Sequence, residues 1–583
     1  MKRCPQCNRV ESDEALKFCR VDGATLVSES SSVGGEAGTA QLGSSPDAGE
    51  VHTSMLPHNT NANVRRATGP TSVLPPQPPP STTRELGKSK RRTTAIVIAV
   101  IATAVVAAVA AILVNSYGSR NSANSIQSIA VMPFVNASGN ADLEYVSDGM
   151  TETLISTLSQ LPKLNVKSRS SVFRYKGKAT DAKTIGQELN VQAVLNGRVM
   201  ERGDQLTFSL ELVNVENENV IWSQQYNRKQ TDLVSLQSEI ARDVLGTIKA
   251  KLSGADEQKV TRAPTTDSEA YQAYLKGRYY WNRRTAENIK KAIEQFKIAT
   301  DRDPNYALAF VGLADCYALL NEYAGVPIAE AAPQTKTYAA RAIAIDGSLA
   351  EPHATLGTID RQLWQWTESE KEFKRAIELN PNYATAYHWY ALTLIYLGRN
   401  EEALSMIQRA HEIDPLSSVI SSTLAWMQLS QNNYQASIDN ELKLIELDPN
   451  FGIAYDTLGL AYLKAGRRSE AVAALEKSAQ LTGRYGLVLG DLGYVYAVTG
   501  KRAEALAIIK ELEERYTRQK ADGMHVAAIY AGLGDKDEAF EWLEKDFQNR
   551  SGNLPDITVT SPFESLRDDS RYKDLRNRIN LPE

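Results

Sequence analysis

Apolar and polar positions repeat every 34 residues through the second half of the chain. One block shows apolar and small residues at helical spacing over two successive segments, at Tyr455, Leu458, Gly459, Tyr462, Ala471 and Leu475. Prolines mark the same period at Pro381, Pro415 and Pro449. A period of 34 residues is the length of a helix–turn–helix unit, which buries its apolar stripe only by stacking on neighbouring units. The pattern therefore predicts an all-α solenoid that offers a surface for binding other molecules.

Glycines fall on the same 34-residue grid. They occur at Gly398, Gly466, Gly500 and Gly534, and Asn432 occupies the slot where glycine is missing. Residues 268–550 resemble tetratricopeptide repeats, which carry a large residue, Leu, a small residue and Tyr on one helix and Ala with an apolar residue on the next. The resemblance implies about eight repeats that bind protein partners or peptides. We expect residues 551–583 to cap the stack with a closing amphipathic helix.

The first helix of each repeat should line the inner side of the solenoid. The residues that we expect there as partner contacts are His388, Ile395, Trp426, Leu429, Asp456 and Tyr494. A mixed aromatic and polar lining suits a protein segment. The alternative, that several of these side chains pack within the solenoid, stays open.

Residues 126–254 carry a different pattern, in which short apolar runs alternate with helical spacing. The order strand–helix–strand, then helix and three strands, predicts a small α/β domain. This segment resembles the N-terminal domain of TolB, through residues 129–134, 145–152, 185–189 and 195–199. The resemblance implies a place beside helical repeats in bacterial envelope and signalling proteins. Asp148, Gly149 and Glu152 are expected to form the start of a helix, where a carboxylate is favoured by the helix dipole.

The run of residues 95–114 contains no charged residue and is long enough to cross a bilayer. It predicts a transmembrane helix over residues 93–116 that contacts membrane lipid. Lys88, Lys90, Arg91 and Arg92 precede it, so the positive-inside rule places the N-terminus in the cytoplasm. The domains that follow would then be periplasmic, in a single-pass protein of a bacterial inner membrane.

Residues 1–27 have the ligand spacing of a zinc knuckle. Cys4 and Cys7 form one pair and Cys19 and Asp22 the other, so that two turns can offer four groups to one tetrahedral ion. The segment resembles the small zinc-ribbon modules of bacterial membrane and regulatory proteins, although Asp22 stands where the family has Cys. Structural zinc is therefore the expected cofactor. Residues 28–92 are rich in Ser, Thr, Gly, Pro and Asn and are expected to be a disordered linker.

Charge and motifs exclude several functional classes. The net charge of −5 gives no overall footprint for nucleic acid, which makes nucleic acid an unexpected partner. The chain has no phosphate-binding glycine loop and no kinase motif. We therefore expect a multidomain, non-catalytic scaffold or adaptor that is anchored in the membrane. The alternative is a membrane-spanning signalling or transcription regulator whose cytoplasmic knuckle relays external binding. The partner, the stimulus and the oligomeric state stay open.

Overall fold

The computed structural model describes residues 126–161, 163–248, 260 and 262–582, together with three short strands near the N-terminus. The chain separates into two compact units, Met1–Thr94 and Ala95–Glu583. In the first unit, β1 (Lys2–Arg3) pairs antiparallel with both β2 (Val10–Glu11) and β3 (Val27–Ser28). The predicted zinc ligands Cys4, Cys7, Cys19 and Asp22, nearly all of the linker and the apolar run 95–114 lie outside the described residues. Within the part that is described, no helix combines the length and the apolar character that a bilayer crossing requires.

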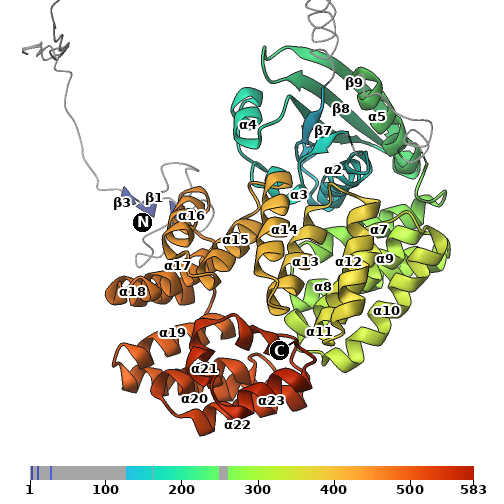
Figure 1. The fold of residues 1–583 in the computed structure, drawn as a ribbon. Coiled ribbons are helices and arrows are strands. Elements are labelled where there is room, and N and C mark those ends of the chain that lie inside the picture. Colours follow the sequence, from blue (N-terminus) through green and yellow to red (C-terminus); the bar gives the residue numbers. More distant parts are fainter. Residues whose placement is uncertain are drawn as a thin grey trace, which may run out of the picture. The chain divides into compact units, whose positions relative to one another are not determined.

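The second unit begins with a small domain built on a mixed sheet, which confirms the predicted mixed α/β architecture (Figure 1). The strand order is β6-β4-β7-β8-β9, with β5 paired to β7 beside this path. Strands β4, β5, β6 and β7 pair in parallel, and β7, β8 and β9 pair antiparallel. The elements are β4 (Ser128–Val131), β5 (Val135–Asn136), η1 (Ala141–Leu143), α2 (Glu144–Ser159), β6 (Asn165–Val166), α3 (Arg169–Phe173), α4 (Ala182–Leu189), β7 (Ala193–Arg202), β8 (Gln205–Asn214), β9 (Val220–Lys229), η2 (Gln230–Asp232) and α5 (Leu233–Thr247).

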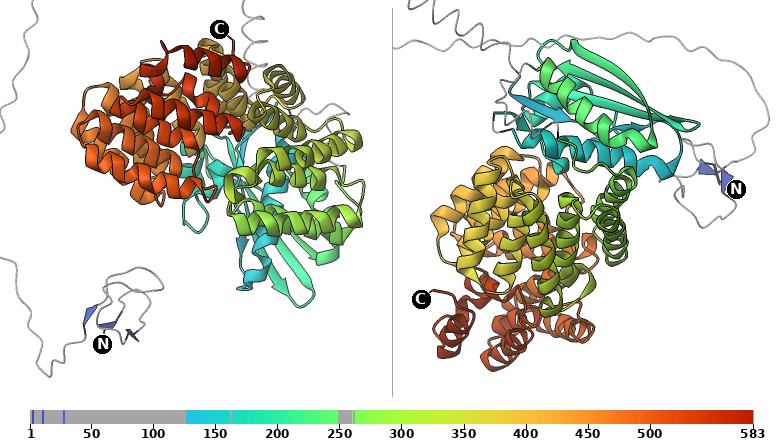
Figure 2. Two further views of the ribbon diagram at one scale, coloured as in Figure 1. Left: turned by 90° about the horizontal axis from the view of Figure 1, so that it is seen from below. Right: turned by 90° about the vertical axis from the view of Figure 1, so that its right-hand side faces the viewer.

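One face of this sheet is covered by α2 and α5 (Figures 1 and 2). Along β8, Leu206, Phe208, Leu210 and Leu212 are buried, whereas Ser209 on the opposite face is exposed. This alternation is the period-2 signature of a half-buried strand.

Helix α2 also connects the sheet domain to the repeats. Its Gly149 lies beside Leu275 of the first repeat helix, and an added Cβ would lie 2.7 Å from the leucine Cδ2 atom. The hydroxyl of Tyr271 lies 3.3 Å from the Thr153 hydroxyl and is fully buried. Gly149 is therefore inside α2 and permits close helix packing, and the expectation that it shapes the helix start is wrong.

Sixteen helices follow as eight antiparallel pairs, so the predicted solenoid is confirmed. The pairs are α7 (Ser268–Trp281) with α8 (Ala286–Arg302), α9 (Ala307–Ala324) with α10 (Ile328–Ile345), α11 (Glu351–Gln362) with α12 (Trp366–Leu379), α13 (Ala384–Tyr396) with α14 (Asn400–Ile413), α15 (Ser418–Ser430) with α16 (Tyr434–Leu447), α17 (Gly452–Lys464) with α18 (Arg468–Leu481), α19 (Gly486–Val498) with α20 (Arg502–Tyr516), and α21 (Gly523–Leu533) with α22 (Lys536–Gln548).

The turn inside each pair explains the glycine grid. The four grid glycines have φ between 74° and 87°, in the left-handed region that favours glycine. Asn432 fills the same slot at φ 63°, as asparagine tolerates this region better than most residues. Trp364 takes the slot one repeat before Gly398, at φ 60°, where a bulky residue is strained. Its ring is buried and stacks on Phe547 with centroids 5.6 Å apart, so packing against α22 offsets the strain.

The C-terminal segment, residues 551–582, covers more than the end of the stack. It forms η3 (Leu554–Thr558), η4 (Ser561–Leu566) and α23 (Ser570–Arg578), and α23 contacts α22 as a cap would. It also reaches helices far back in the chain. The indole Nε1 of Trp366 donates to the carbonyl oxygen of Ile579 at 2.9 Å, and the Tyr396 hydroxyl donates to Asp556 at 2.5 Å. The segment therefore joins the third and fourth helix pairs to the last one in a single apolar core.

Candidate protein-binding surface

The inner side of the solenoid is formed by the first helix of each pair, and the C-terminal segment lies on part of it. Helix η3 contacts α13, and η4 contacts α21. Lys464, at the end of α17, forms an ion pair with Glu564 of η4 at 2.5 Å. Three first helices are therefore already in contact with a segment of the same chain.

The predicted contact residues are placed on these helices, but most are buried. His388, Ile395, Leu429 and Asp456 are all less than 9% exposed. Trp426 is half-buried, as is Tyr494. Packing within the solenoid, the alternative left open by the sequence, therefore describes the four buried side chains in this structure. A role for any of the six in binding a partner stays a prediction.

His388 shows how a buried polar residue on this face finds a partner within the solenoid. Its Nε2 atom lies 3.0 Å from the Thr423 hydroxyl of the next repeat. Burial, with the charge of Arg361 nearby, lowers the pKa of His388 to about 4, so the ring is neutral at physiological pH. In the described part of the chain, no group of three acidic, His or Cys side chains has the geometry to hold a metal ion.

Buried carboxylates form a second feature of the solenoid. Glu441 on α16 accepts a hydrogen bond from the Ser422 hydroxyl at 2.7 Å and is fully buried. Burial raises the pKa of Glu441 to about 8, so its carboxyl is largely protonated at neutral pH. Burial also raises the pKa of Asp456 on α17 and of Asp491 on α19, and the charge of Asp456 raises that of Asp491 further. Burial thus disfavours the charged form of all three carboxyls.

Asp414 anchors the sheet domain to the middle of the solenoid. Its carboxylate, only 2% exposed, accepts hydrogen bonds from the hydroxyls of Ser168, Ser170 and Ser171, which lie at and after the N-cap of α3. Buried Lys167 lies close enough for the Asp414 charge to raise its pKa, although burial has the larger effect and lowers it.

Asp414 occupies a position that recurs in each repeat, but its side chain makes a different contact from those of its equivalents. Residues 34 positions before and after it, Asn380 and Asp448, also follow the second helix of a pair. Asn380 accepts a hydrogen bond from the Asn382 amide of its own loop at 3.0 Å. Asp414 contacts another domain instead. Neither this anchor nor α3 is predicted by the sequence pattern, because five helical residues and a serine cluster give no periodic signal.

A charged network forms the second junction between the domains. Glu152 of α2 forms ion pairs with Arg278 at 2.5 Å and Arg169 at 3.1 Å, and Arg278 continues to Asp315 of α9 at 3.3 Å. Burial opposes the ionisation of Glu152, but the two arginines outweigh it and leave its pKa below the usual value. Glu152 is well inside α2, which begins at Glu144, so the expectation of a helix-dipole role is wrong.

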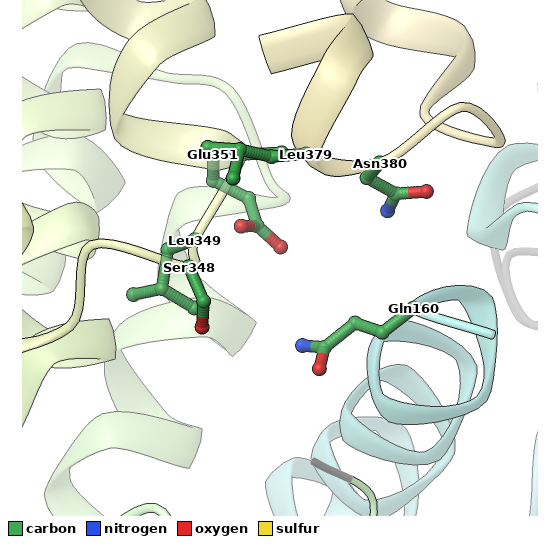
Figure 3. A pocket seen from close by; sticks show the side chains of 7 residues that line it. Gln160, Ser348, Leu349, Glu351, Leu379 and Asn380 are labelled. Carbon is green, nitrogen blue, oxygen red and sulfur yellow. The ribbon is translucent and has the colours of Figure 1, made fainter. Parts of the chain in front are cut away.

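A hollow lies beside this network, between the end of α2, the start of α11 and the end of α12. Its lining includes Gln160, Ser348, Glu351 and Asn380 (Figure 3). The empty volume is about 250 Å³, part of it open to solvent, which is less than most ligand pockets enclose. We therefore assign the hollow to the junction and not to a ligand.

The helical part matches known repeat families. Models described as tetratricopeptide repeat match residues 274–325, 372–405 and 453–484. The solenoid consists of tetratricopeptide repeats. A different model, described as the second domain of HilA/YgeH-like transcriptional regulators, matches residues 124–243. This match covers the sheet domain, whose resemblance to TolB stays a prediction.

Curated relatives resemble parts of the chain. A putative adenylate cyclase 3 of Rhizobium meliloti is 30% identical over 234 residues, which are 39% of each chain. The transcriptional regulator HilA of Salmonella typhimurium is 22% identical over 320 residues, or 54% of this chain and 55% of the relative. The chain thus spans about two fifths to just over half of the length of these relatives.

Solved structures also match part of the chain. The structure of Pseudomonas aeruginosa PilF matches 37% of this chain and 94% of its own, at 20% identity and a TM-score of 0.30. The tetratricopeptide protein TTC0263 of Thermus thermophilus matches 34% of this chain and 97% of its own, at 23% identity and a TM-score of 0.26.

The Asp414 anchor predicts a stability effect. Asp414→Ala leaves three hydroxyls and a buried lysine without their common partner, and should lower the free energy of unfolding by about 2–3 kcal/mol. Hydrogen exchange should also rise in α3. Asp448→Ala is the matched control at the equivalent repeat position, where the carboxylate accepts from Ser418 at 3.0 Å. Urea titration and exchange mass spectrometry measure both, and equal effects of the two variants would contradict the anchor.

Glu441 predicts a pH-dependent stability. Its folded pKa of about 8 lies above the unfolded value of about 4.3. Its contribution is therefore complete below about pH 4 and is lost as pH rises through about 8. Relative to Glu441→Gln, the wild-type free energy of unfolding should fall by up to about 1.4 kcal/mol per pH unit in this window. Denaturation curves at several pH values test this, with exposed Glu446→Gln on the same helix as control. A pH-independent difference would refute it.

Proposed function

We propose that this chain is a non-catalytic protein-binding scaffold of the bacterial envelope. The observation that carries the proposal is that the repeats already hold a piece of polypeptide without repeat character, the C-terminal segment of short helices, through an apolar core and polar anchors. A surface that binds its own chain in this way has the chemistry to bind a partner's chain. The tetratricopeptide repeats support the same class of function.

The partner contacts would be the aromatic residues of the predicted set that keep partial exposure. Trp426 on α15 and Tyr494 on α19 are the half-buried aromatic residues of the predicted set. Large aromatic side chains that are partly desolvated before binding contribute strongly to protein interfaces. The buried junctions at Asp414 and Glu152 hold the sheet domain against the same repeats, so the scaffold meets a partner as one preorganised body.

The proposal also includes a membrane anchor and a bound zinc ion. Residues 95–114 would anchor the chain in the inner membrane, with the knuckle of Cys4, Cys7, Cys19 and Asp22 holding zinc on the cytoplasmic side. The repeats would then lie in the periplasm. Confinement to a membrane raises the effective concentration of the scaffold near membrane-bound partners.

Partner binding predicts a strong effect at Trp426. A photo-reactive amino acid placed at 426 in the full chain should form a discrete adduct in cells, and one at Leu442, exposed on the second helix of the same pair, should not. For the partner so identified, Trp426→Ala should weaken binding about 30-fold, as a loss of about 2 kcal/mol requires. Leu442→Ala should leave the affinity unchanged. Identical adducts at both sites, or an unchanged affinity in folded Trp426→Ala, would refute the proposal.

A second candidate is a membrane-spanning regulator. The similarity to HilA favours it, because the alignment with HilA covers 320 residues. It is therefore longer than the sheet domain, which the HilA-like family model matches over residues 124–243. In this case, binding outside the membrane would change what the zinc knuckle touches inside.

Zinc and DNA binding separate the two candidates. The purified full chain should contain zinc, and Cys4→Ser should remove it, whereas Cys316→Ser, which alters a buried thiol in α9, should not. A scaffold should show no retention on DNA. Retention that falls steeply with salt and disappears in Cys4→Ser would instead establish the regulator.

A further inference from the structure

Strand β9 forms one edge of the mixed sheet. Nine of its ten residues pair with β8 on one side, Ile221 being left out at a register shift, and no other strand among the described residues pairs with its outer side (Figure 1). An outer edge of this length presents a row of backbone N–H and C=O groups that can pair with another strand.

Apart from a register shift at Ile221, near the start of the strand, the stretch from Trp222 to Asn227 lacks the usual features that prevent such pairing. It contains no proline, and its central residues Ser223, Gln224 and Gln225 are uncharged and exposed. Val220 and Ile221 are 54% and 39% exposed. Charged residues, prolines and bulges are the common protections of an edge strand. The only charges of β9 lie at one end.

These two charges are already paired within the domain. Arg228 forms an ion pair with Glu239 of α5 at 2.7 Å, and Lys229 lies 3.4 Å from Asp204. They therefore bring little net charge to the edge.

We propose that β9 pairs antiparallel with β9 of a second copy of this chain, with Gln224 on the two-fold axis. In a continuous sheet, residues that lie opposite each other must point to the same face. The sequence numbers of two opposed residues in the two copies must therefore differ by an even number. With Gln224 at the centre, Trp222 of each copy lies opposite Tyr226 of the other. Ser223 lies opposite Gln225, and no like charges are opposed.

This register extends the apolar rows of each sheet. Within one copy, Trp222 already lies opposite Leu212, and Tyr226 lies opposite Phe208. The pairing places Trp222 of one copy next to Tyr226 of the other. Each row then runs from Leu212 and Trp222 of one copy to Tyr226 and Phe208 of the other. Aromatic cross-strand pairs are among the stabilising pairs of antiparallel sheets.

The dimer goes beyond the proposed function, because it does not depend on what the repeats bind. It would bring two sets of repeats into one assembly and so permit bivalent binding.

A charge exchange at the two-fold axis tests the dimer. Light scattering should show the purified full chain as a dimer, and Gln224→Lys should weaken dimerisation at least severalfold, because two ammonium groups then lie opposite each other. Gln224→Glu should do the same alone, but an equimolar mixture of the two variants should form the heterodimer. Trp222→Ala should also weaken the dimer.

The control is Ser209→Lys, an exposed position of β8 in the same sheet, which should leave the dimer intact. Circular dichroism establishes that each variant is folded. A monomeric wild type, equal loss of the dimer in Ser209→Lys, or no association in the Lys and Glu mixture would overturn the proposal. Pairing of β9 with a different protein would appear as a monomeric wild type.

Discussion

A helix pair of the solenoid cannot bury its apolar faces alone, and this constraint governs both ends of the stack. At the first end, α2 of the sheet domain packs on α7, with Gly149 admitting Leu275 and with Tyr271 fully buried. At the last end, the C-terminal segment covers α22 and then continues across the inner side. The three parts, namely the sheet domain, the repeats and the C-terminal segment, therefore depend on one another to bury their apolar faces and are not independent modules.

Features with a local cause could be predicted from the sequence, and long-range contacts could not. The 34-residue period predicts the solenoid because each repeat needs the same left-handed turn, which glycine or Asn432 provides. Trp364 in the same slot could not be anticipated, because Phe547, nearly two hundred residues later, stabilises it. The Asp414 anchor was missed for the same reason: its serine partners have no period and lie in another domain.

Burial of the inner face shows where sequence reasoning about a binding site fails. The repeat pattern correctly places His388, Ile395 and Asp456 on first helices. It cannot say that these side chains are buried, because their burial depends on contacts between repeats, such as that of His388 with Thr423. Of the predicted set, Trp426 and Tyr494 keep partial exposure. The zinc ligands remain predictions for a different reason, since they lie outside the described residues.

The energy of the C-terminal segment determines how a partner can bind. Leu554, Ile557, Phe563 and Leu566 are each at most 1% exposed. Exposing four such side chains would cost about 6–12 kcal/mol, at about 1.5–3 kcal/mol each. This cost equals the whole free energy of a micromolar to nanomolar complex, about 8–12 kcal/mol. A partner that displaced the segment would have almost no affinity left, so the segment acts as a permanent part of the inner wall. Binding at the half-buried aromatic residues Trp426 and Tyr494, and pairing at the edge of the sheet, require no such displacement.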